Sequence, residues 1–195
     1  MGLVRITDER DANRFYLFDA TERATMASNL IHLSIFAFFP TLMALSASMD
    51  LLTFTIPNRI CVALALGYVI FAALLGVPAV NILLNMSCGL AILLITFGMF
   101  SFGWLGGGDA KLAAATAAWL GWTAILDYGL AAALFGGILT LILLGLRTVP
   151  LPAPLARFAW LARLHNASAG VPYGIALAAA GLMQFPNSSI WAAVV

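Results

Sequence analysis

Long uncharged stretches alternate with short charged interruptions along this chain, and the alternation predicts its elements. No Asp, Glu, Lys or Arg occurs between Arg59 and Asp109, a gap of 49 residues. One transmembrane helix needs about 20 apolar residues, so the gap predicts two membrane-spanning helices and a tight turn between them. Glycine and proline interrupt the helical run at residues 76–78, and we expect the turn there.

Three further spans are predicted on either side of this gap. Residues 24–49 form the first uncharged window, which is one span long. Residues 111–126 and 128–146 form two more windows. We expect these to be separate helices, divided at residues 127–129, where Asp, Tyr and Gly follow one another.

The end of the chain has a different pattern. Residues 147–170 hold three prolines and several basic side chains, so we expect a loop with a short interfacial helix. Residues 171–195 are apolar again and supply a sixth span. Because lipid-exposed backbone groups must bond internally, every span should be an α-helix. The expected fold is an all-α integral membrane bundle of about six transmembrane helices over residues 29–195, preceded by a polar tail over residues 1–28.

Composition agrees with a membrane protein and excludes other classes. Of the 195 residues, 63% are hydrophobic and 9% are charged, whereas soluble domains carry about 25% charged residues. High hydrophobicity excludes a disordered chain, and a formal net charge of +1 leaves no basic surface for nucleic acid. Cys61 and Cys88 lie 27 positions apart inside apolar runs, which fits neither a disulfide framework nor a zinc site. We therefore expect no metal centre.

The distribution of basic residues predicts the orientation in the membrane. The loops after the first, third and fifth spans carry all the basic residues beyond the tail, Arg59, Lys111, Arg147, Arg157 and Arg163. Since Lys and Arg favour the cytoplasm, these loops should be cytoplasmic and both termini outside. The four arginines of the tail favour the opposite side for that segment. The five tryptophans lie mostly near predicted span ends, as interface aromatics do.

Three acids follow the tail, and they are the candidates for chemistry at membrane depth. Asp50 ends the first span, Asp109 follows Gly106, Gly107 and Gly108, and Asp127 comes later. Asp50 and Asp109 fall at cytoplasmic helix ends at the same depth, whereas Asp127 falls on the other side. A single Asp after glycines also fits the first turn of a helix, where it complements the helix dipole. Acids that survive in a membrane domain are nevertheless candidates for function.

Two carboxylates on one membrane face can act together on a peptide bond. When they share a site they ionise one after the other. The ionised carboxylate then takes a proton from water while the protonated one polarises a carbonyl. This is aspartic-protease chemistry, which uses no metal and no cofactor. Without Cβ atoms, the three glycines let a substrate backbone approach Asp109 closely.

These residues carry a family resemblance. Gly106–Asp109 resembles the GxGD motif of intramembrane-type aspartic proteases. Its continuation Ala110–Leu112, and the position of Asp50 six residues before the sequence Ile56-Pro57-Asn58, resemble type IV prepilin peptidases. The short, single-function Tad/Flp-pilin branch is the most similar. Residues 170–176, GVPYGIA, resemble that family's C-terminal proline-aromatic-glycine segment.

The resemblance implies roles for individual residues. It makes Asp50 and Asp109 the catalytic pair of an aspartic endopeptidase in the bacterial inner membrane. The implied substrate is a Flp-type prepilin, cut on the cytoplasmic side after a glycine that ends a basic leader. Pro57 and Asn58 would set the geometry of the Asp50 loop, with Asn58 capping the second span. Lys111 matches the motif, and it would equally serve as an anchor whose ammonium reaches the lipid headgroups.

Two departures and two alternatives qualify this hypothesis. The longer bifunctional members carry CxxC pairs, which this chain lacks, so we expect neither their zinc site nor their methyltransferase activity. The Asp50 loop has Leu52, Phe54 and Thr55 where the family usually has basic residues.

A transporter or channel subunit that binds ions or protons at Asp50 and Asp109 is an alternative from another class. A presenilin-like protease is a nearer one.

Overall fold

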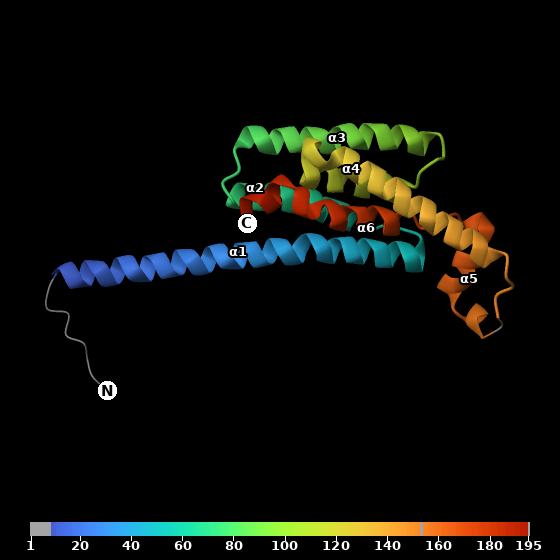
Figure 1. The fold of residues 1–195 in the computed structure, drawn as a ribbon, viewed down its shortest axis with the longest axis horizontal. Helices are drawn as coiled ribbons and strands as arrows, with labels where there is room; N and C mark the ends of the chain where they lie inside the picture. Colours follow the sequence, from blue (N-terminus) through green and yellow to red (C-terminus); the bar gives the residue numbers. More distant parts are fainter. Residues whose placement is uncertain (1–8, 153, 195) are drawn as a thin grey trace. The chain divides into compact units, whose positions relative to one another are not determined.

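A computed structural model describes residues 9–152 and 154–194, and all regular elements within those ranges are helical (Figure 1). The predicted all-α class is therefore confirmed. The α-helices are α1 (Glu9–Thr53), α2 (Asn58–Leu74), α3 (Ala79–Ser101), α4 (Gly107–Arg147), α5 (Ala159–His165), α6 (Gly174–Gln184) and α7 (Ser189–Val194). Three 3-10 turns accompany them, at Leu155–Arg157, Ala167–Ala169 and Phe185–Asn187.

Several of these helices have the length and apolar character of membrane spans. Within the described residues, three are long and apolar enough to cross a membrane: Thr25–Thr53 of α1, α3 and α4. Helix α2 is a shorter apolar helix. The protein is an all-α membrane protein. The number of six spans remains a prediction.

The chain divides into two compact parts, residues 1–37 and residues 38–195, which are described separately. In the first part, the described residues 9–37 form the N-terminal length of α1. Arg23 there pairs with Asp19 one turn earlier, with 2.9 Å between Nη2 and Oδ2. The predicted polar tail is thus helical from Glu9 onward, and its first eight residues lie outside the described ranges.

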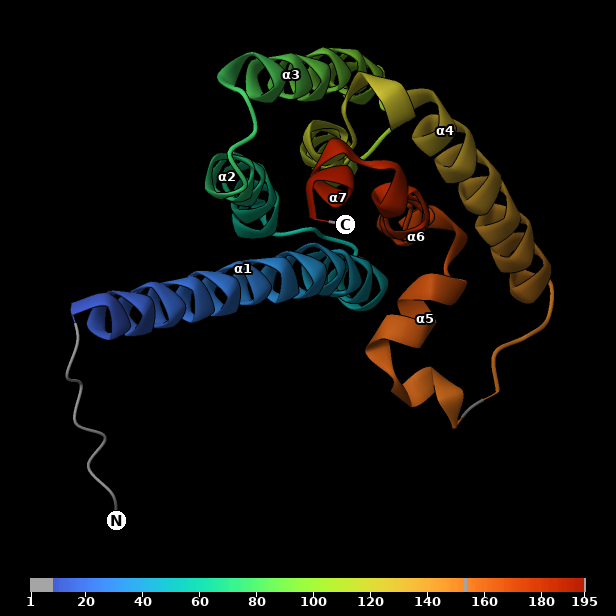
Figure 2. The ribbon, with the colours of Figure 1, turned by 60° about the vertical axis from the view of Figure 1, so that its left-hand side comes forward.

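The first half of α4 forms the core of residues 38–195. From Ala110 to Gly121 every residue except Lys111 is buried. A helix that is apolar on nearly all sides is stable only when surrounded, and α2, α3 and α6 pack against this one (Figure 2). Small residues allow the close approach. A Cβ on Gly89 of α3 would lie 3.0 Å from the Ala114 carbonyl oxygen of α4.

Trp119 is the largest side chain at the centre of this core. It is fully buried, and its indole Nε1–H donates to the Leu64 carbonyl oxygen of α2 at 2.8 Å. The rings of Phe39 and Phe185 lie 5.0 and 6.1 Å from it, centroid to centroid. The expectation of an interface position is wrong for Trp119, because its one polar group is bonded inside the bundle.

Helix α4 is interrupted at a different residue from the one expected. Residues 127–129 are helical, and the break lies at Gly121, with φ +69° and ψ −176°. That conformation is accessible to glycine and to almost no other residue. Helix α4 changes direction part of the way along its length (Figures 1 and 2). The prediction of a division at Asp127 is therefore wrong, although two helical segments do occur.

Two other predicted boundaries have different outcomes. The turn expected at residues 76–78 is confirmed, because α2 ends at Leu74 and α3 begins at Ala79. The expected single helix over residues 171–195 is wrong. It is divided into α6 and α7 by the 3-10 turn Phe185–Asn187, which contains a proline that has no N–H to donate to a continuous helix.

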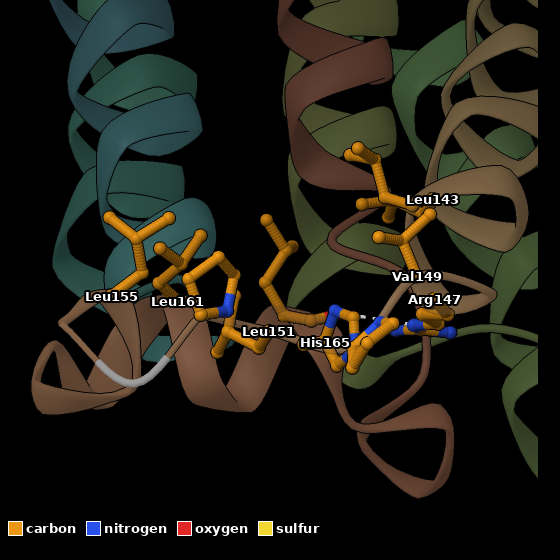
Figure 3. A pocket seen from close by; sticks show the side chains of 11 residues that line it. Leu143, Arg147, Val149, Leu151, Leu155, Leu161 and His165 are labelled. Atoms are coloured by element: carbon orange, nitrogen blue, oxygen red, sulfur yellow. Dashed lines mark hydrogen bonds between the residues drawn. The ribbon is translucent and has the colours of Figure 1, made fainter.

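The segment 147–170 contains the short helix α5, as the prolines and basic residues indicated. Arg147 ties the segment to the end of α4. Its Nε donates to the Leu164 carbonyl oxygen at 3.0 Å and its Nη2 to the Gly170 carbonyl oxygen at 2.6 Å. A cavity of about 220 Å³ lies beside Arg147 and is lined mainly by leucine and proline side chains (Figure 3).

The backbone at Gly121 yields a prediction about stability. Gly121→Ala should lower the free energy of unfolding by about 1–3 kcal/mol, because alanine is strained in this conformation. A Cβ there would also meet the Asn85 side chain. Thermal unfolding of the purified protein in detergent measures the change. Gly137→Ala is the matched control, since a Cβ at that helical position meets nothing within 4 Å. Equal stability of the two variants would contradict the prediction.

Candidate functional site

Asp50 lies in the last turn of α1 and is held by the beginning of α6. Its side chain is buried, with 5% of the residue's surface exposed. The backbone N–H of Gly174 donates to Oδ2 of Asp50 at 2.7 Å. The first N–H groups of a helix have no partner within the helix. A carboxylate is a favourable acceptor there because the helix N-terminus carries partial positive charge.

The loop after Asp50 turns the chain sharply into α2. Phe54 has φ +55°, which ends α1, and its N–H donates to the Asp50 carbonyl oxygen at 2.8 Å. Pro57 occupies the N-cap position of α2 and makes no side-chain cap bond. The expectation that Asn58 caps α2 is therefore wrong. Its Oδ1 instead accepts a hydrogen bond from Lys111 Nζ at 2.9 Å.

Asp109 lies in the first turn of α4, three residues after the N-cap glycine. Its Oδ2 lies close to the N-cap residue, because a Cβ on Gly106 would come within 2.9 Å of it. Its other oxygen, Oδ1, is buried and has no hydrogen-bond partner. A buried acceptor without a partner costs free energy. The position of Asp109 at the beginning of α4 therefore does not account for this buried oxygen.

The structure brings Asp50 and Asp109 to the same cavity. This space of about 300 Å³, named here the carboxylate cavity, is lined by Asp50, Phe54, Thr55, Ile56, Asn58, Gly106, Gly107, Gly108 and Asp109. Asp127 lines a different cavity, together with side chains such as Leu130 and Gln184. The two acids expected to meet thus share one site, and the third lies elsewhere.

Two glycines allow the helices to converge at this cavity. A Cβ on Gly108 would lie 3.1 Å from Cβ of Ile56, so glycine lets the beginning of α4 approach the Asp50 loop. A Cβ on Gly174 would lie 2.8 Å from both Oδ2 of Asp50 and Cδ1 of Ile56. Sequence reasoning named neither Gly174 nor Ile56 as part of the site. The proline-aromatic-glycine segment was the available signal for Gly174.

Helix α5 also contacts the Asp50 loop. Arg163 Nη1 donates to the Thr53 carbonyl oxygen at 3.0 Å, at the end of α1, where carbonyl groups have no helical partner. The Thr53 hydroxyl is bonded to the Met49 carbonyl oxygen and lies 2.8 Å from the Thr55 hydroxyl. The end of α1 therefore bonds both to α5 and to the loop that follows it.

Metal ligands do not gather in the part of the chain that the structure describes. No three His, Cys, Asp or Glu side chains among those residues lie together as a metal site requires. Cys61 and Cys88 are both buried free thiols.

The fold and the site together define an all-α membrane protein with two acids in one cavity at helix ends. The sequence pattern of the type IV leader peptidase family matches residues 37–141, more than half of the chain, and this protein belongs to that family. Asp50 and Asp109 both lie within the matched residues, and Gly174 lies beyond them.

One relative illustrates the similarity. The prepilin leader peptidase/N-methyltransferase of Pectobacterium carotovorum subsp. carotovorum is 53% identical over 58 residues. These residues make up 30% of this chain and 21% of that protein, so the match spans about a fifth of the relative's length. No solved structure matches the chain significantly.

The close approach at Gly174 yields a prediction about the site. Gly174→Ala should lower the free energy of unfolding by about 1–3 kcal/mol, because its methyl group would collide with Asp50 and Ile56 in a packed region. Thermal unfolding in detergent measures the effect. Gly145→Ala, where a Cβ meets nothing within 4 Å, should unfold at the wild-type temperature or above it. If both variants unfolded at the same temperature, the predicted close contact between Gly174 and Asp50 would be contradicted.

Proposed function

We propose that this protein is a membrane aspartic endopeptidase that removes the leader peptide from type IV prepilins. The proposal includes a Flp-type substrate, cleavage at the cytoplasmic face of the bacterial inner membrane, and no methyl transfer. The observation that carries it is the shared cavity of Asp50 and Asp109 in a member of the leader peptidase family.

The two carboxylates divide the chemistry of hydrolysis between them. One of them is ionised and takes a proton from a water molecule, which attacks the carbonyl carbon of the peptide bond. The other is protonated and donates its proton to the carbonyl oxygen. The C–N bond then breaks, and the leaving amine receives a proton from the pair. The Gly174 N–H and the backbone of Phe54 both bond to Asp50, which supports a fixed position for Asp50 in the cavity that Asp109 also lines.

The location of the acids favours a peptidase over ion transport. Asp50 lies three residues before the end of α1, and Asp109 two residues after the beginning of α4. Transporters place their acids near the middle of the bilayer, at broken helices of repeated halves. Acids at helix ends instead fit the proposed hydrolysis of a peptide bond near the membrane surface.

The substrate branch and the absence of methyl transfer rest on the sequence. No CxxC pair occurs in these 195 residues, and the bifunctional members carry such pairs. The resemblance to the short Tad/Flp branch supports a Flp-type prepilin. Co-expression with such a prepilin, scored by the loss of leader mass, tests this part of the proposal.

The carboxylate pair yields a prediction about activity. Asp50→Asn and Asp109→Asn should each abolish prepilin cleavage, because an amide keeps the shape of the carboxyl group but cannot exchange its proton. A gel-shift assay of leader removal, with purified protein in detergent, measures the rate. Circular dichroism and thermal unfolding establish that each variant is folded.

Asp127→Asn is the matched control for these two variants. It changes the remaining acid of the membrane domain, which lines a separate cavity, so it should cleave at the wild-type rate. Wild-type cleavage by either the Asp50 or the Asp109 variant would refute the assignment. Loss of cleavage in all three would point to a general effect of charge.

The same mechanism predicts a bell-shaped dependence of cleavage on pH. At low pH both carboxyl groups are protonated and no base remains, whereas at high pH both are ionised and no acid remains. The rising and falling limbs belong to the pair as a whole. Initial-rate measurements give kcat/KM at each pH, and tryptophan fluorescence checks that the protein stays folded. A rate that only rises with pH would contradict a carboxylic acid as proton donor.

A further inference from the structure

An apolar groove lies beside the carboxylate cavity, between α2, α3 and α4. It has a volume of about 450 Å³ and is lined by Asn58, Cys61, Val62, Ala65, Met86, Gly89, Leu90, Leu93, Lys111, Ala114, Ala115 and Ala118. Helices α2 and α3 both pack on α4 but contact each other little (Figure 2). The groove is the space that this arrangement leaves open, with α4 as its floor.

The groove and the carboxylate cavity are adjacent, because they share one lining residue. Asn58 lines both spaces, and Lys111, which binds Asn58, lines the groove two residues after Asp109. From Lys111 to Ala118 the groove follows α4 for about 10 Å, or two helical turns. A substrate segment that runs from the carboxylate cavity past Asn58 would therefore meet the groove next.

Lys111 supplies the only charge of the groove lining. Its ammonium binds the neutral Asn58 oxygen, and no carboxylate of the described residues lies within 4.0 Å of it. Every other lining residue except Asn58 is apolar. The chemistry of the groove therefore fits an apolar segment that carries an acidic group at the end nearest the carboxylate cavity.

We propose that this groove binds the apolar helix of the substrate, the segment that follows the cleaved bond, and that Lys111 pairs with a substrate carboxylate close to the cut. The inference rests on the proposed peptidase function and adds where the membrane part of the substrate lies. The shared lining residue Asn58 and the ammonium of Lys111 at the end nearest the carboxylate cavity favour a substrate segment over a lipid chain. The groove then fixes which peptide bond reaches Asp50 and Asp109.

Site-specific photocrosslinking tests the occupant of the groove. The full chain carries Asp109→Asn to keep the substrate uncut, and a benzophenone amino acid replaces Val62, which lines the groove and is 55% exposed. It is placed in phosphatidylcholine nanodiscs with a prepilin that has a leader, an apolar helix and a glutamate near the cut. The matched control replaces Ala73, an exposed residue of the same helix outside the groove.

We expect adducts with the substrate helix at position 62 to exceed those at position 73 by about tenfold or more, since only the groove holds the helix. Adducts at position 62 with lipid alone, with a second copy of the chain, or with nothing would overturn the inference. Cleavage by the otherwise unaltered chain is measured in parallel. If that chain cleaves and position 62 gives no substrate adduct, only the groove assignment fails. If it does not cleave, the proposed function fails first.

A charge exchange tests the role of Lys111. Lys111→Glu should lower kcat/KM for the glutamate substrate by about tenfold or more, and a substrate with lysine at that position should restore most of the loss. Arg59→Glu is the control, because Arg59 lies one residue from Asn58 but lines neither space. Loss of activity without restoration by the lysine substrate would show that Lys111 does not pair with the substrate.

Discussion

The hydrogen bond from the Gly174 N–H to Asp50 is the interaction on which the site depends. It joins residues 124 positions apart in the sequence, at the end of α1 and the beginning of α6. The helix terminus supplies an N–H that needs an acceptor, and the carboxylate is a buried acceptor that needs a donor. Each satisfies the other, and the absence of a Cβ at Gly174 makes the contact sterically accessible.

The buried first half of α4 has the corresponding role for Asp109. Its small side chains let α2, α3 and α6 surround it, and Trp119 bonds it to α2. A helix held on several sides has little freedom to slide, so the residues of its first turn have a defined position. Asp109 is therefore presented to the Asp50 loop by packing several turns away from it.

In the proposed function, the carboxylate cavity and the apolar groove divide the recognition of a membrane substrate. The polar cavity lies at helix ends, and the groove lies beside it along α4, between α2 and α3. Asn58 and Lys111 lie where the two meet. Under that proposal, the position of the cut relative to the apolar helix of the substrate is set by the distance between the two spaces.

The sequence by itself determined the all-α membrane class, the turn at residues 76–78 and the candidate acids Asp50 and Asp109. These follow from local quantities, namely the length of uncharged stretches, the placement of glycine and proline, and the rarity of acids. Only the tertiary structure decided that α4 bends at Gly121, that Trp119 is central, and that Gly174 completes the site. The φ angle of a glycine and its neighbours in space are set only when distant helices pack against it. Glycine has no Cβ and adopts many backbone conformations, so the sequence alone does not indicate which one it takes.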